Sequence, residues 1–164
     1  MQLAALTREA GASCLLVSHD LAFVSNLADQ VIVLYLGTVL ERGPAQRLMT
    51  RPRHPYTAAL LGASPQGYLA GEASPRYRLR GELPSPLRPP SGCQFRTRCP
   101  FAEARCAEER PLLRPADGDG MVACHFSERL AVPIRQIAQG LDPETPVARP
   151  SSPLPPHTSR TDFQ

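Results

Sequence analysis

The chain has 164 residues, of which 42% are hydrophobic and 20% charged, enough for one modest domain or two small ones. The formal net charge is +3, and the 18 basic residues, all arginines, are interspersed with 15 acidic ones, a pattern that disfavours nucleic-acid binding. No apolar run is as long as a membrane span or follows the pattern of a secretory signal. We therefore expect a soluble intracellular protein whose 5 cysteines are not paired in disulfides.

The first expected element is a helix over residues 1–10, in which apolar residues recur at positions 3, 6 and 10. Gly11 follows as its terminator. No Ser, Thr, Asp or Asn precedes the periodic pattern to cap the helix. This favours a helix that was once longer at its amino end, and hence a chain that is the carboxyl-terminal part of a larger protein.

An apolar run, residues 14–17, ends in the polar triplet Ser18-His19-Asp20 and is followed at once by helix-like residues 21–28. The pattern predicts a buried parallel strand, with Cys14 as a small core residue, that leads into a helix through a polar corner. Ligands bind beyond the carboxyl ends of strands in open α/β sheets, so His19 is a candidate functional residue. We interpret Asp20 as the helix cap rather than as a catalytic group, because its carboxylate can accept free amide hydrogens of the first turn.

The next stretch alternates strand, turn and helix signals. Residues 30–36 read as a buried strand, Gly37-Thr38 as a tight turn, and residues 39–42 as the returning strand. Gly43-Pro44 is expected to open a short helix through Met49. A further helix is expected to begin in the segment 54–57 and to end at Gly62.

Residues 63–78 are expected to form a linker, and residues 78–86 show a short strand-like alternation before a proline cluster. Farther on, residues 130–137 are apolar-periodic and predict a short helix. Residues 140–164 are rich in Pro, Ser and Thr and are expected to be disordered.

Four cysteines, Cys93, Cys99, Cys106 and Cys124, fall within 32 residues and are separated by gaps of 5, 6 and 17 residues. Four thiolates converging from loop-rich sequence suit a tetrahedral metal or an iron–sulfur cluster. No pair has the two-residue gap of a zinc knuckle, which lowers the case for zinc. Spacing alone leaves open a metal centre and four unligated thiols in a small core.

Five arginines lie among these cysteines and allow two interpretations. They could form a contact face for a partner subunit, or they could form a solvated surface, which the interleaved glutamates favour. The arginines are Arg96, Arg98, Arg105, Arg110 and Arg114, and the glutamates are Glu103, Glu108 and Glu109.

A family resemblance rests on residues 15–21 (Leu-Leu-Val-Ser-His-Asp-Leu), 28–31 (Ala-Asp-Gln-Val) and 34–43 (Leu-Tyr-Leu-Gly-Thr-Val-Leu-Glu-Arg-Gly). In this order they resemble the last third of an ABC transporter ATP-binding subunit. The sequence His-Pro-Tyr-Thr-Ala-Ala-Leu-Leu at 54–61 narrows the resemblance to the oligopeptide/dipeptide importers, and the resemblance extends over about residues 1–126.

The resemblance implies an α/β fold, namely an incomplete carboxyl-terminal part of an ABC-type P-loop nucleotide-binding domain followed by a small loop-rich four-cysteine module and a disordered tail. It divides the chain into residues 1–64 (the end of the ATP-binding domain), residues 65–129 (the carboxyl-terminal extension of the peptide transporters) and residues 130–164 (a mostly disordered tail).

In the family, the histidine after this strand is the switch histidine, which contacts the γ-phosphate of ATP and helps to hold the attacking water. The resemblance places this role on His19. The chain has no lysine and therefore no Gly-x-x-x-x-Gly-Lys phosphate loop. The glutamine loop, the signature motif and the apolar strand ending in Asp-Glu are also absent from this sequence. We therefore expect that this chain alone neither binds ATP tightly nor hydrolyses it, and that ATP with Mg belongs to a complete subunit.

The extension resembles that of family members understood to hold a [4Fe-4S] cluster, through the segments 81–86, 89–95, 98–100 and 122–125. The resemblance puts the cluster ligands on Cys93, Cys99, Cys106 and Cys124, with zinc as the less favoured metal. His125 is a weaker ligand candidate than the adjacent Cys124. Such a cluster would be structural, tying together loops that bury little apolar surface.

The implied function is that of an ATP-binding subunit that energises import of di- or oligopeptides across the cytoplasmic membrane. Its partners would be a second ATP-binding subunit and the integral membrane permease subunits, on the cytoplasmic face of the membrane, without contact to the peptide or to nucleic acid. One alternative is a non-catalytic iron–sulfur or zinc-binding interaction module. Another is a remnant that does not fold, because half a sheet leaves open edges.

Overall fold

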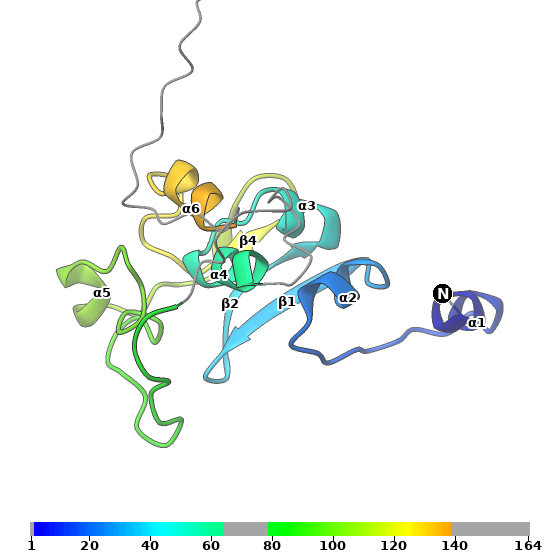
Figure 1. The fold of residues 1–164 in the computed structure, drawn as a ribbon, viewed down its shortest axis with the longest axis horizontal. Helices are drawn as coiled ribbons and strands as arrows, with labels where there is room; N and C mark the ends of the chain where they lie inside the picture. Colours follow the sequence, from blue (N-terminus) through cyan, green and yellow to red (C-terminus); the bar gives the residue numbers. More distant parts are fainter. Residues whose placement is uncertain (1, 64–78, 139–164) are drawn as a thin grey trace, which may run out of the picture.

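The computed structural model describes residues 2–63 and 79–138. Of the expected linker only Ala63 is described, and the expected tail is described only as far as residue 138. Two helices precede the first strand, and short elements separated by loops follow it (Figure 1). In chain order the elements are α1 (Gln2–Glu9), α2 (Leu21–Ser25), β1 (Gln30–Tyr35), β2 (Thr38–Pro44), α3 (Ala45–Thr50), α4 (Pro55–Ala63), α5 (Ala104–Glu108), β3 (Arg114–Pro115), β4 (Met121–Val122) and α6 (Ala131–Ala138).

The described strands form one antiparallel sheet in the order β1-β2-β4-β3. The hairpin of β1 and β2 confirms the strand, turn and returning strand predicted from the sequence, but β1 is buried on one face only. Its turn has positive φ angles at Leu36 (47°) and Gly37 (75°), a backbone twist that matches that of the flanking strands. The expected α/β sheet contained a parallel strand, and the described part of the sheet has none.

The predicted helices are confirmed, with small shifts of their ends. Gly11 lies just past α1 with φ 59°, as expected for a helix terminator. Pro44 stands immediately before α3, and α6 covers most of the segment predicted from periodicity. None of the described helices is long and apolar enough to cross a membrane. The strand-like alternation near Arg80 forms no strand in its described part, residues 79–86, because prolines remove amide donors there.

The arm, defined here as residues 12–20, corrects the prediction of a buried strand. It contains neither helix nor strand, and Leu15 and Val17 are 92% and 89% exposed. Cys14 is exposed and is not a core residue. A strand persists only when a neighbour takes up its N–H and C=O groups, and no described strand lies beside the arm. Figure 1 shows α1 at the far end of this extended stretch, apart from the sheet.

Apolar side chains gather in two cores. The larger one joins the sheet to α3, α4 and α6 through buried residues such as Val33, Leu48, Leu61 and Ile134. The second core lies at the tip of the hairpin and joins Tyr35 and Leu40 to Phe95, Cys93 and Cys106. The cysteine segment therefore shares its core with the hairpin.

Strand β2 ties the two halves of the described chain together. It pairs with β1 on one side and with β4 on the other, and the N–H of Ala123 donates to the carbonyl of Leu40 at 2.8 Å. The predicted boundary at residues 64–65 falls in the segment that the structure does not describe. The boundary therefore stays a prediction. The sheet and the second core both include residues from before and after it.

A buried polar network fixes the start of α4. The carboxylate of Glu41 accepts bonds from Nη1 of Arg47 (2.6 Å), from the N–H of Arg53 (2.9 Å) and from the N–H of His54 (2.9 Å). Nδ1 of the buried His54 accepts the N–H of Tyr56 at 3.0 Å, and burial lowers the pKa of His54 to about 3. A neutral imidazole in this place fits a wholly buried site without a charged partner.

Candidate functional site

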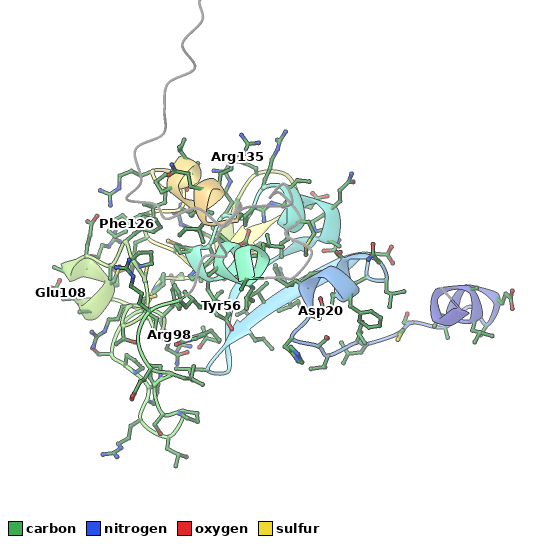
Figure 2. All side chains as sticks on the ribbon, in the orientation of Figure 1. Asp20, Tyr56, Arg98, Glu108, Phe126 and Arg135 are labelled. Carbon is green, nitrogen blue, oxygen red and sulfur yellow. The ribbon has the colours of Figure 1, made fainter. Side chains whose placement is uncertain are left out.

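The polar corner around His19 is built by local hydrogen bonds. Oγ of Ser18 accepts the N–H of Asp20 at 3.0 Å, and Oδ1 of Asp20 accepts the N–H of Phe23 at 3.1 Å. This confirms the prediction that Asp20 caps the helix, and Figure 2 shows it at the start of α2. His19 lies on the exposed bend between these two residues, so its side chain is accessible from solvent.

A groove of about 560 Å³ opens beside this region, between α2 and α3. It contains neither His19 nor any of the four candidate cysteine ligands, so the site residues predicted from the sequence lie outside it. The residues lining it are Ser25, Ala28, Asp29, Pro44, Ala45, Gln46, Met49 and Thr50.

The four candidate cysteines are brought together by three different parts of the fold. Cys93 and Cys106 are buried in the second core, and the N–H of Cys93 donates to the carbonyl of Cys106 at 2.8 Å. Cys99 packs against the same core, and Cys124 follows β4. The thiols of Cys93, Cys106 and Cys124 each raise the pKa of Cys99, which places all four within electrostatic reach of one another.

Three of these cysteines share a local motif, in which a phenylalanine follows two residues later. The N–H of Phe126 donates to Sγ of Cys124 at 3.5 Å, and the N–H groups of Phe95 and Phe101 stabilise the thiolates of Cys93 and Cys99. Amide bonds to sulfur of this kind are common where cysteines bind a metal. The repeated Cys-x-Phe is a signal in the sequence that the spacing of the cysteines alone does not reveal.

The thiols are shielded from solvent, and this governs their protonation. Burial raises the pKa of Cys99 to about 12 and that of Cys124 to about 11, and it also raises the pKa of Cys93. As free thiols they stay protonated at neutral pH, so a metal would have to displace their protons on binding. All four are free cysteines, without a disulfide.

The described residues contain no group of three or more His, Cys, Asp or Glu side chains set to hold a single metal ion. The thiols of Cys93, Cys106 and Cys124 nonetheless act electrostatically on that of Cys99. The described residues therefore bring four thiols near one another without arranging a set that could hold a metal.

The hairpin tip is fastened to the loop that carries Cys93. The side-chain amide of Gln94, with its nitrogen facing the hairpin, donates to Oγ1 of Thr38 (2.5 Å) and to the carbonyls of Tyr35 (3.2 Å) and Leu36 (3.3 Å). The ring of Phe95 lies against those of Tyr35 and Tyr56, with centroid separations of 5.3 Å in both cases. Figure 2 shows Tyr56 and Arg98 near this junction.

The arginines of this region have partners within the chain. Arg96 bonds Ser91, Arg110 bonds Thr38, Arg105 pairs with Glu109, and Arg114 pairs with Glu128. These contacts occupy four of the five arginines, whereas Nε of Arg98 is buried without a hydrogen-bond partner. Nε2 of His125 lies 3.0 Å from the carbonyl oxygen of Glu109, an arrangement that leaves Cys124 as the better ligand candidate.

Comparison with known proteins places this geometry in a family. Residues 40–106, which include most of the hairpin strand β2 and three of the four cysteines, match the family described as Oligopeptide/dipeptide transporter, C-terminal region. The matched segment begins within β2 and ends within α5, and both ends contribute to the second core.

Similar proteins carry names from peptide transport. The Di/tripeptide transport ATP-binding protein DppF of Pseudomonas aeruginosa is 50% identical over 113 residues, 69% of this chain and 34% of the relative. The Probable peptide ABC transporter ATP-binding protein y4tS of Sinorhizobium fredii is 45% identical over 120 residues, 73% of this chain and 34% of the relative. The Dipeptide transport ATP-binding protein DppF of Haemophilus influenzae is 42% identical over 119 residues, 73% of this chain and 36% of the relative. The chain spans about a third of the length of these relatives.

Proposed function

We propose that this chain is the carboxyl-terminal part of an ATP-binding subunit that energises import of di- or oligopeptides. The observation that carries the proposal is the match of residues 40–106 to the transporter family, together with relatives named as ATP-binding proteins of peptide transport. The proposed partners are a second ATP-binding subunit and membrane permease subunits, at the cytoplasmic face of the membrane. The transported peptide makes no contact with this chain.

The exposed apolar side chains at the amino-terminal end support this assignment. Besides Leu15 and Val17 of the arm, Phe23 of α2 and Ile32 and Leu34 of β1 are at least half exposed. Exposed apolar residues are typical of a surface that packs against another protein part when they form one patch. The rest of the ATP-binding subunit would cover them and would supply neighbours for the arm.

We assign His19 the role of contacting the γ-phosphate and holding the attacking water, as the family resemblance implies. An imidazole on an exposed bend can donate to a phosphate oxygen on which charge develops, without blocking the water. The phosphate loop and the carboxylates that bind Mg would come from the rest of the subunit. The isolated chain should therefore show no ATP turnover, and a phosphate-release assay on purified chain with appreciable turnover would contradict this.

A chimera tests the role of His19. This chain is joined to the Pseudomonas aeruginosa relative in place of that protein's matching 113 residues, and ATP hydrolysis and dipeptide uptake are measured with its membrane partners. The chimera should hydrolyse ATP, His19→Ala should lower turnover by about 100-fold or more, and the control His157→Ala should leave it unchanged. A folded chimera without activity would overturn the proposed subunit, and an active His19→Ala variant would overturn the role of His19.

We also propose that Cys93, Cys99, Cys106 and Cys124 hold a [4Fe-4S] cluster with a structural role. The mutual coupling of the four thiols and the amide bonds to three sulfurs support a shared metal group, and the family resemblance favours a cluster over zinc. When bound, the cluster would tie the loops through four iron–sulfur bonds. This proposal is compatible with either the transport subunit or a non-catalytic interaction module.

Metal analysis of anaerobically purified chain tests the cluster. Iron and inorganic sulfide should be present in the ratio of a [4Fe-4S] cluster, with broad visible absorption. Cys106→Ser should remove both, and the exposed Cys14→Ser should change neither. A colourless, metal-free and well-folded chain would defeat the proposal, and zinc without iron would replace it by the zinc alternative.

A further inference from the structure

Cys124 depends on side chains for its position more than the other three cysteines do. Cys93 and Cys106 are fixed by a backbone bond to each other within the second core, and Cys99 packs against that core. Cys124 packs instead against the larger core, on a turn between β4 and α6. Within the turn, Sγ of Cys124 accepts the N–H of Phe126 at 3.5 Å, and a side chain from outside the turn holds the carbonyl oxygen of Cys124.

Arg114 of β3 makes the contacts that hold this turn. Its Nη2 donates to the carbonyl oxygen of Cys124 at 3.0 Å, to Oγ of Ser127 at 3.1 Å and to Oε2 of Glu128 at 2.8 Å. Its Nη1 donates to Oε1 of Glu128 at 2.6 Å. One guanidinium thus holds Cys124 and two residues farther along the turn, Ser127 and Glu128.

The geometry of these contacts requires an arginine. The planar guanidinium holds both oxygens of Glu128 in a fork and still presents Nη2 to the carbonyl of Cys124, which a lysine ammonium cannot do at once. The side-chain bond from Arg114 lowers the pKa of Glu128 to about 2, so this carboxylate stays charged at neutral pH. The backbone also places the pair, because Arg114 lies opposite Val122 in the register of β3 and β4.

Arg129 makes a second set of contacts with this turn. The guanidinium of Arg129 lies 4.5 Å above the ring of Phe126 and pairs with Glu103, whose carbonyl accepts the N–H of Cys106. The turn is thus connected to the helix that carries Cys106. This contact steadies the ring of Phe126, whereas only Arg114 bonds the Cys124 backbone among the described side-chain contacts.

We propose that Arg114 is a positioning residue that directs the Cys124 sulfur towards the other three thiols. The reason for the arrangement rests on the proposed function, in which the four thiols bind one group. The positioning itself is a property of the metal-free chain. Loss of the guanidinium should free the turn, expose Cys124 and leave the other three cysteines where they are.

The test uses pulse alkylation of the full metal-free, reduced chain, with N-ethylmaleimide and peptide mapping to give a rate for each cysteine. In Arg114→Lys and Arg114→Gln the alkylation rate of Cys124 should rise by about tenfold, because each variant loses one charge-assisted hydrogen-bond network. Cys93 and Cys106 should react at the same rates as in the wild type. The matched control is Arg53→Gln, which breaks the Arg53–Asp117 ion pair away from the turn and should change no cysteine rate.

Every outcome decides the proposal. A rise confined to Cys124 supports it, whereas an equal rise at all four cysteines shows a general loss of structure and overturns it, as does no change at Cys124. Anaerobic reconstitution of the same variants with iron and sulfide adds a second reading, because the visible absorption of Arg114→Lys should decay faster under a chelator. If the wild-type chain takes up no cluster, the cluster proposal fails. The alkylation rates then still decide whether Arg114 positions Cys124.

Discussion

The arm and the loop of residues 91–103 both lack helix and strand, but they differ in how far their side chains are buried. The arm, residues 12–20, is rich in branched apolar residues and is exposed except at Leu16, which packs against the larger core. The loop of residues 91–103 is polar and proline-containing, yet it buries Cys93 and Phe95 and is bonded to the hairpin through Gln94. An apolar segment therefore forms no strand when no other strand pairs with it. An irregular loop is ordered when its side chains have specific partners.

The largest expected effect concerns the turn that leads into Cys93. Gly92 has φ 61°, and a Cβ there would overlap the backbone of Cys106 and approach the carbonyl of Ala107 at 2.8 Å. Gly92→Ala should therefore lower the free energy of unfolding by on the order of 3 kcal/mol, measured by urea denaturation. Gly118→Ala is the matched control, because Gly118 has the same φ of 61° with nothing within 4 Å of its Cβ position, so it carries the backbone strain alone. Equal losses in the two variants would contradict the steric argument.

The junction between the hairpin and the cysteine loop should be sensitive to acid. His54 lies against Phe95 and has its pKa lowered to about 3 by burial, from 6.5. As the pH falls below 6.5, His54 becomes protonated in the unfolded chain but stays neutral in the folded chain. The free energy of unfolding therefore decreases until the pH reaches the folded pKa of about 3. The loss should be roughly 2 kcal/mol between about pH 6 and pH 4. His54→Asn, whose side-chain oxygen can accept the N–H of Tyr56, should remove this part of the pH dependence, and an unchanged profile would contradict it.

The smallest effect is expected in the arm. Leu15→Ala should change the free energy of unfolding of this chain by less than about 0.5 kcal/mol, because Leu15 is 92% exposed. The control Leu48→Ala removes a fully buried side chain of the larger core and should cost about 2–5 kcal/mol. A decrease of more than about 1 kcal/mol in the free energy of unfolding of Leu15→Ala would show that the arm is packed in solution. The difference in burial between the arm and the cysteine loop would then be wrong.

The sequence predicted the elements whose stability is local. The apolar run of residues 30–36 predicted β1, Gly37 predicted the turn, and the prolines predicted the starts of α3 and α4. Asp20 was predicted as a cap because the bond from its carboxylate to Phe23 spans only three residues. Periodicity could not show that the run ending at Val17 has no strand beside it, since that depends on distant chain.

The candidate site was predictable only in part. The four cysteines were evident from their type and spacing, and the resemblance suggested the role of His19, which stays a prediction. The pairing of β2 with β4 was not predictable, because two-residue strands carry no periodicity. The contacts of Arg114 were equally hidden, since they join residues 10 to 14 positions apart through one side chain.

The pairing of β4 with β2 also bears on how the protein avoids self-association. An uncovered strand presents free N–H and C=O groups, on which a second chain can build an intermolecular sheet. Met121 and Val122 cover part of β2, and the bond from Ala123 to Leu40 extends this cover. A chain cut before Met121 would leave that edge of the hairpin open. The short strand after the third cysteine thus covers this edge of the hairpin, and β1 stands at the other edge of the described sheet.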